Sequence, residues 1–127
     1  MEARRLQNVG VEVETGDVIH FNDGSESYPH FISKCTVAYL GKLNGYFVEC
    51  EAKTPRGEID CLLYHPDRRN LAVEVETGIT PDVVEDKLDR YVYQQEGIDD
   101  MFIFDVQNKP TGDMDMLQWV AKNTGLK

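Results

Sequence analysis

Between residues 46 and 76, two short segments alternate apolar and polar residues, a third strand-like segment lies between them, and only short connections separate the three. The segments are residues 46–52, 58–64 and 71–76. Alternation with a period of two is typical of strands that bury one face. The first connection contains Pro55 and Gly57 and the second contains Pro66 and Asp67, residue types that favour turns. The pattern predicts three consecutive strands and a sheet at the centre of the fold.

Helix starts flank these strands on both sides. Pro29 follows Ser27 and Pro81 follows Thr80, so each site offers a capping hydroxyl before a proline in the first turn. Helices are predicted over residues 29–43 and 80–95, a fourth strand over 101–106, a last helix over 113–123, and a hairpin over 9–22. The order predicts a mixed α/β fold, as three layers or as a sheet with helices on both faces.

Size and composition favour one domain. The chain has 127 residues, enough for one core, and residues 1–28 are expected to form an N-terminal hairpin extension, 29–106 the core and 107–127 a C-terminal helix. No apolar run suits a transmembrane helix, and the N-terminus lacks the apolar stretch of a signal peptide, so an intracellular, cytoplasmic protein is expected. Cys35, Cys50 and Cys61 form no CxxC pair and are expected to be small buried residues.

The net charge of −10 opposes binding to nucleic acid, whose phosphates attract basic residues. Two features would let so acidic a chain still bind nucleic acid. The charge could be spread unevenly, because residues 1–29 carry six acids and two bases whereas residues 30–57 carry four bases and two acids. Alternatively, the protein could work at high salt, where the reach of surface charge is short.

Three carboxylates stand out within the predicted strands. Asp60 lies in the middle of a strand, where an acid is costly without a partner. Glu74 and Glu76 are two residues apart and therefore project from the same face. If the second and third strands form a hairpin through residues 65–70, Asp60 comes opposite or diagonal to them. Converging carboxylates repel each other, and a hard divalent cation such as Mg²⁺ or Mn²⁺ relieves the repulsion. Solvent-facing glutamates on an amphipathic strand are the alternative.

The run GEIDCLLYHPDRRNLAVEVETG, residues 57–78, resembles the core of the PD-(D/E)XK nuclease superfamily, which includes restriction endonucleases and archaeal Holliday-junction resolvases. The resemblance implies a restriction endonuclease-like αβββαβ core over residues 29–106. It also implies that Asp60 and Glu74 bind the metal with the backbone carbonyl of Val75, in a prokaryotic, archaeal or viral protein.

The chain departs from the family pattern at Glu76, which stands where the family has lysine. The resemblance leaves two roles open for Glu76, which could bind a second ion or orient water. Lys87 on the following helix could supply the missing ammonium, because at about 100° per residue it falls on the sheet-facing stripe between Val83 and Tyr91. The alternative for Lys87 is a lysine at the edge of the helix, paired with an acid one turn away.

Further residues near the predicted core have two interpretations each. Glu49 and Glu51 could add a metal ligand or point to water. The nearby basic residues could contact DNA phosphates or occupy ordinary surface positions. They are His30, Lys34, Arg56, Arg68 and Arg69.

Taken with the resemblance, these features predict a Mg²⁺- or Mn²⁺-dependent DNA endonuclease, either structure-specific like a junction resolvase or of restriction type. A homodimer would place two sites on two DNA strands. A catalytically inactive module of the same fold that binds DNA or protein is the alternative, and a small acidic interaction protein is a third. Motifs of serine hydrolases, P-loop NTPases and dinucleotide-binding proteins are absent from the sequence.

Overall fold

The computed structural model describes residues 2–13, 27–76, 78–105 and 113–126, and every structural statement below refers to them. In chain order its elements are α1 (Glu2–Asn8), α2 (Tyr28–Leu43), β1 (Phe47–Thr54), β2 (Gly57–Tyr64), β3 (Leu71–Glu76), α3 (Pro81–Leu88), a π-helical turn (Asp89–Tyr93), β4 (Asp100–Asp105) and α4 (Asp113–Thr124).

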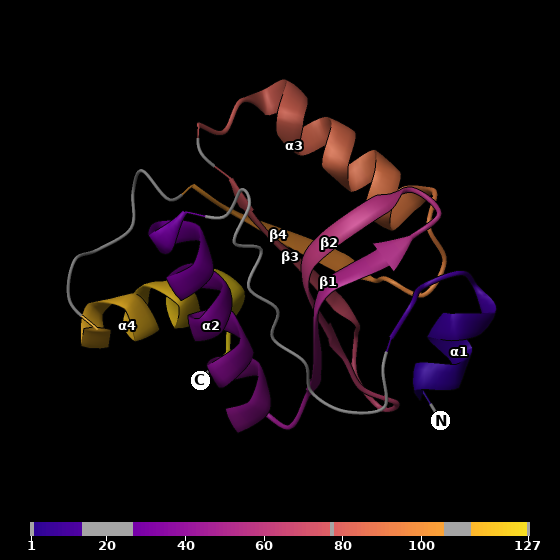
Figure 1. The fold of residues 1–127 in the computed structure, drawn as a ribbon, viewed down its shortest axis with the longest axis horizontal. Coiled ribbons are helices and arrows are strands. Elements are labelled where there is room, and N and C mark those ends of the chain that lie inside the picture. The colour runs from indigo at the N-terminus through magenta and orange to yellow at the C-terminus, as the bar shows by residue number, and fades with distance from the viewer. Residues whose placement is uncertain (1, 14–26, 77, 106–112, 127) are drawn as a thin grey trace.

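The four strands form one mixed sheet in the order β1-β2-β3-β4. β1 pairs with β2 and β2 with β3 in antiparallel fashion, whereas β4 lies parallel to β3 after the crossover through α3. Figure 1 shows α2 and α4 together on one side of the sheet and α3 on the other. The predicted α/β fold, a mixed sheet flanked by helices, is confirmed.

Both predicted helix starts are confirmed at the level of single hydrogen bonds. The Ser27 hydroxyl accepts from the His30 N–H at 3.3 Å and caps α2. The Thr80 hydroxyl accepts from the Val83 N–H at 3.3 Å and caps α3. The helix predicted over residues 80–95 is thus present, but its second half is the π-helical turn. Such turns interrupt α-helices mainly where a local function or packing need requires it.

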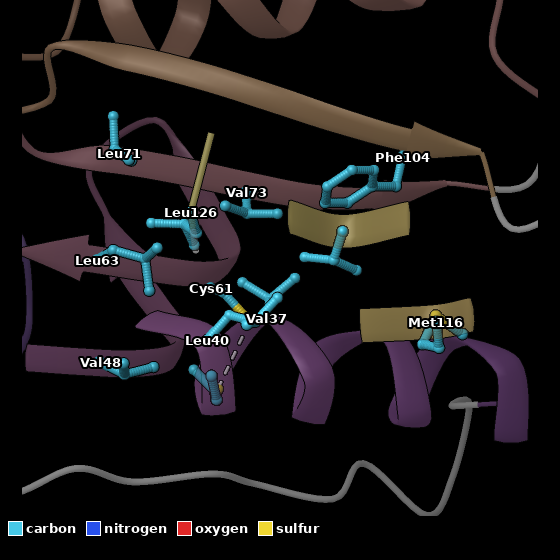
Figure 2. Close-up of a cluster of buried hydrophobic side chains, with 13 residues drawn as sticks. Val37, Leu40, Val48, Cys61, Leu63, Leu71, Val73, Phe104, Met116 and Leu126 are labelled. Atoms are coloured by element: carbon cyan, nitrogen blue, oxygen red, sulfur yellow. Dashed lines mark hydrogen bonds between the residues drawn. The ribbon is translucent and has the colours of Figure 1, made fainter. Parts of the chain in front are cut away.

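Two apolar cores lie on opposite faces of the sheet. The first lies between the sheet and helices α2 and α4, and Figure 2 shows its side chains, among them Val37, Val73 and Phe104. The second joins the other face to α1 and the π-helical turn through Leu6, Ile59, Tyr91 and other residues. Cys50 and Cys61 are fully buried as predicted, whereas Cys35 is half-buried.

The N-terminal part differs from the expectation where it is described. Residues 2–8 form α1, a helix that the sequence did not indicate. Most of the predicted hairpin, residues 14–22, lies outside the described residues, and Glu12 pairs with Lys53 of β1 through an isolated antiparallel bridge. Leu6 is fully buried, which explains why this short helix is held against the sheet.

None of the described helices has the length and apolar character that crossing a membrane requires.

Candidate active site

Asp60 and Glu74 lie where the β2–β3 ladder ends. Its last backbone pair is Cys61↔Val73, and the same register would next place Asp60 opposite Glu74. The Asp60 N–H donates to Glu74 Oε2 at 2.8 Å, and the Val75 N–H donates to Asp60 Oδ2 at 2.8 Å. Each carboxylate therefore accepts a backbone N–H of the opposite strand. This exchange fixes both acids side by side in the middle of the sheet.

Lys87 of α3 brings an ammonium to this pair from the face that α3 covers. Its Nζ lies 2.9 Å from Glu74 Oε1 and 2.7 Å from Glu76 Oε1. The Lys87 side chain is only 17% exposed and Glu74 is buried, so water screens their ion pair weakly. Glu74 and Glu76 project from the same face because they are two apart on β3, as the sequence predicted. The four charged groups Asp60, Glu74, Glu76 and Lys87 are called the carboxylate–lysine cluster below.

Burial and mutual repulsion shape the protonation of the cluster. Burial and the neighbouring Asp60 charge raise the pKa of Glu74 to about 8, against the opposing effect of Lys87. Burial also raises the pKa of Asp60, but the hydrogen bonds from His30 and the Val75 N–H outweigh it and leave a net lowering. Burial lowers the pKa of Lys87, yet the Glu74 charge and the bonds to both glutamates raise it above its ordinary value. Two adjacent acids with oppositely shifted pKa values are typical of functional carboxylate pairs.

The raised pKa of Glu74 predicts a pH-dependent stability. Between its ordinary value of 4.5 and its folded value of about 8, the unfolded chain ionises while the folded chain keeps the proton. The contribution of Glu74 to the free energy of unfolding is therefore fully present below pH 4.5. It is lost as the pH rises toward 8, by up to about 1.4 kcal/mol per pH unit. Urea unfolding of wild type and Glu74→Gln between about pH 5.5 and 8.5 measures it. The free energy of unfolding of wild type should fall relative to that of Glu74→Gln as the pH rises. Parallel curves of the two free energies against pH would contradict the raised pKa of Glu74.

His30 and Lys34 both belong to α2 but have different surroundings. His30 Nε2 lies 3.4 Å from Asp60 Oδ1, so the first turn of α2 borders the cluster. Lys34 is fully buried, and its Nζ lies 2.9 Å from Glu51 Oε1. A fully buried ammonium does not meet a ligand at the surface, so the structure lends no support to the suggested contact of Lys34 with DNA phosphates, which stays a prediction. Lys34 lies on the core-facing side of α2, where its charge requires a partner.

The remaining candidates lie on β1 and in the connections on either side of β2. Glu49 is buried at 3% exposure, so it does not point to water, and Glu51 binds Lys34. Arg68 donates to the Asn44 carbonyl and Arg69 to the Asp99 carbonyl, in the loop at the opposite end of β3 from Glu76. Arg56 is exposed at the β1–β2 turn. These three arginines remain exposed and available to an anionic partner, but none of them contacts the cluster through an observed bond.

The donor chemistry of Asp60 and Glu74 fits a hard divalent cation, which prefers carboxylate oxygens. Within the described part of the chain, however, no group of three or more His, Cys, Asp or Glu side chains is arranged to hold a metal ion. The Lys87 ammonium already contacts Glu74 Oε1 and Glu76 Oε1. A metal bound here would have to share or displace this ammonium.

No protein-family model matches the chain, and no curated protein or solved structure matches it either. Any function assigned to the cluster therefore rests on its geometry and on the resemblance of residues 57–78.

The sequence did not indicate the pairing of Lys34 with Glu51 or the contact of His30 with Asp60. A signal for the first was present, because Lys34 shares the buried stripe of α2 with Val37, Ala38 and Gly41 at spacings of three, four and seven. A lysine on such a stripe is buried and must find an acid. The identity of that acid depends on how α2 packs on β1, and the spacing of residues in the sequence does not reveal this packing.

Proposed function

We propose that the chain is a metal-dependent DNA endonuclease with a restriction endonuclease-like core of the PD-(D/E)XK type. The observation that carries the proposal is the exchange of hydrogen bonds between Asp60 and Glu74 across β2 and β3, with Lys87 Nζ 2.9 Å from Glu74. Two adjacent acids that repel each other at the end of a ladder, one of them buried, destabilise a fold. A functional need therefore explains their presence better than stability does.

The arrangement of elements supports the proposed core. A helix, three antiparallel strands, a helix and a strand parallel to the third follow one another from α2 to β4. This is the order that the resemblance implies for residues 29–106. The first acid lies on β2 and the second on β3, as the resemblance also implies.

In the proposed mechanism, Asp60 and Glu74 would hold Mg²⁺ or Mn²⁺ with the help of the Val75 carbonyl. When bound, the metal supplies a Lewis acid for the phosphate and lowers the pKa of a water molecule. Glu76 would hold a second ion or orient the attacking water. The Lys87 ammonium, held between Glu74 and Glu76, stabilises the negative charge that develops on the phosphate. His30 orients the Asp60 carboxylate from the N-terminal turn of α2.

The proposed substrate is DNA, and the acidity of the chain restricts how it is bound. With 23 acids against 13 bases, long-range attraction cannot drive association, so contacts must be local. Exposed arginines at the β1–β2 turn and in the β2–β3 loop are candidates for these contacts. A branched junction would let a small homodimer place one cluster on each of two strands.

A catalytically inactive module of the same fold, which binds DNA or protein, is the second candidate. It is favoured by Glu76 at the lysine position and by the contacts of the Lys87 ammonium with Glu74 and Glu76. In this case the cluster would be a structural ion pair.

A cleavage assay separates the two candidates. Branched, single-stranded and duplex DNA are incubated with the protein and Mg²⁺, Mn²⁺ or EDTA, at low and at molar salt. The nuclease proposal expects cleavage of at least one substrate that depends on the metal. Metal-dependent cleavage confined to the branched substrate would support the resolvase-like form. DNA binding without cleavage under every condition would favour the inactive module.

A further inference from the structure

A second charged group, distinct from the carboxylate–lysine cluster, lies between α2 and β1. Lys34 of α2 is fully buried, and its Nζ lies 2.9 Å from Glu51 Oε1 on β1. Lys34 Nζ also lies 5.5 Å from the centre of the Phe31 ring. A buried ammonium is costly unless a partner compensates it, and an apolar residue of the same size would normally serve the core better. The pair therefore needs an explanation other than stability.

Glu51 has an unusual backbone. Its φ is 55°, and it is the one described residue other than glycine with a positive φ. This left-handed conformation favours glycine, and other residues adopt it only where their surroundings hold them there. The side chain of Glu51 is held by Lys34, which supplies that constraint.

The β1–β2 ladder is interrupted at this residue. Cys50 pairs with Cys61 on one side and Ala52 with Ile59 on the other, but no pairing joins Glu51 to Asp60 between them. Residues two apart on a regular strand lie on the same face.

Here they do not. Cys50 and Cys61 pack in the core under α2, whereas Ala52 and Ile59 pack in the core on the opposite face. Both strands therefore change face at Glu51 and Asp60, and the left-handed Glu51 is the point at which β1 turns over.

Asp60 is thus flanked by two irregular neighbours, the interrupted ladder toward β1 and the end of the ladder toward β3. We propose that the Lys34–Glu51 ion pair holds the β1–β2 ladder open opposite Asp60 and thereby positions the Asp60 carboxylate for cation binding. Lys34 and Glu51 are then positioning residues that act through Asp60. The consequence for metal binding rests on the proposed function, whereas the consequence for the backbone around Asp60 does not.

The test uses Lys34→Met, which removes the ammonium and fills the same space. Without the cation, Glu51 is expected to relax toward extended backbone and to draw Asp60 toward β1, away from its hydrogen bonds with β3. The Asp60 and Val75 amides, which donate to Glu74 and Asp60, should then exchange with solvent at least about tenfold faster in metal-free protein, as NMR measures. The Kd for Mn²⁺ from calorimetry should rise at least about tenfold.

A second substitution separates positioning from a general loss of packing. Glycine adopts a φ of 55° without penalty, so Glu51→Gly in the Lys34→Met background should restore both amide exchange and Mn²⁺ affinity to within about threefold of wild type. Lys42→Met, an exposed lysine on the same helix, is the matched control and should change neither quantity.

The outcomes are distinct. Wild-type exchange and affinity in folded Lys34→Met would overturn the positioning role. If Lys34→Met does not fold, the variant that combines Lys34→Met with Glu51→Gly decides. A folded double variant with tenfold weaker Mn²⁺ affinity and fast exchange of the Asp60 amide also overturns the positioning role. If wild type binds no Mn²⁺, the proposed function fails, and the exchange of the Asp60 and Val75 amides in metal-free protein still decides the role of the ion pair.

Discussion

Replacing Asp60 with asparagine, or Glu74 with glutamine, should lower the rate of Mn²⁺-dependent DNA cleavage by about a thousandfold or more, because each change removes a charge that holds the metal. The fold should survive. In Asp60→Asn the new amide oxygen can still accept the Val75 N–H, which Asp60 Oδ2 accepts at 2.8 Å in the native chain. Glu74→Gln replaces a buried carboxyl group whose ionisation burial and the Asp60 charge already oppose. Single-turnover cleavage and thermal melting of each variant, in the same buffer, measure the two effects.

The combination of the two measurements is what identifies functional carboxylates. A residue kept for stability lowers the melting temperature when it is replaced, whereas a residue kept for function lowers activity and leaves the melting temperature unchanged or higher. Glu58→Gln is the matched control, since Glu58 is an exposed acid on the same strand, two residues before Asp60. Undiminished cleavage by Asp60→Asn would contradict the mechanism, and so would a loss of cleavage that is equal in Glu58→Gln.

Much of the fold could be predicted because its signals are local. Ser27 before Pro29 and Thr80 before Pro81 mark helix starts through bonds within one turn, and the structure contains both. The strands were predictable because the turn at residues 54–57 and the period of two are short-range features. The same alternation placed Glu74 and Glu76 on one face, and the helical angle placed Lys87 toward the sheet.

The parts that could not be predicted depend on contacts between distant segments. α1 has too few residues to be stable alone. Its place is set by burial of Leu6 against the face of the sheet opposite α2 and α4. The face change at Glu51 runs against the regular alternation of β1, which the sequence shows as uninterrupted. We attribute it to the ion pair with Lys34, which lies 17 residues earlier in the chain. Spacing rules assume regular elements, so they fail where a side chain from another element distorts the backbone.

Lys87→Met should reveal whether a metal and the ammonium share the same carboxylates. Without metal, the variant leaves Glu74 and Glu76 with no ammonium at 2.9 and 2.7 Å, and the free energy of unfolding should fall by about 2 kcal/mol. Saturating Mn²⁺ should then raise the melting temperature of the variant more than that of wild type, because the ion no longer competes with Lys87 and binding stabilises the folded state. Cleavage should nevertheless fall by about a hundredfold, since the ammonium that stabilises the phosphate charge is gone.

Lys122→Met, an exposed lysine on α4, is the control and should show the wild-type response to Mn²⁺. An equal rise in melting temperature for Lys87→Met and wild type would mean that the ion binds elsewhere and that Lys87 is a structural partner of the two glutamates. A larger rise would mean that the carboxylates accept either cation. In that case the ammonium compensates their charge in the metal-free protein, which explains how two repelling acids persist in the middle of the sheet before the metal binds.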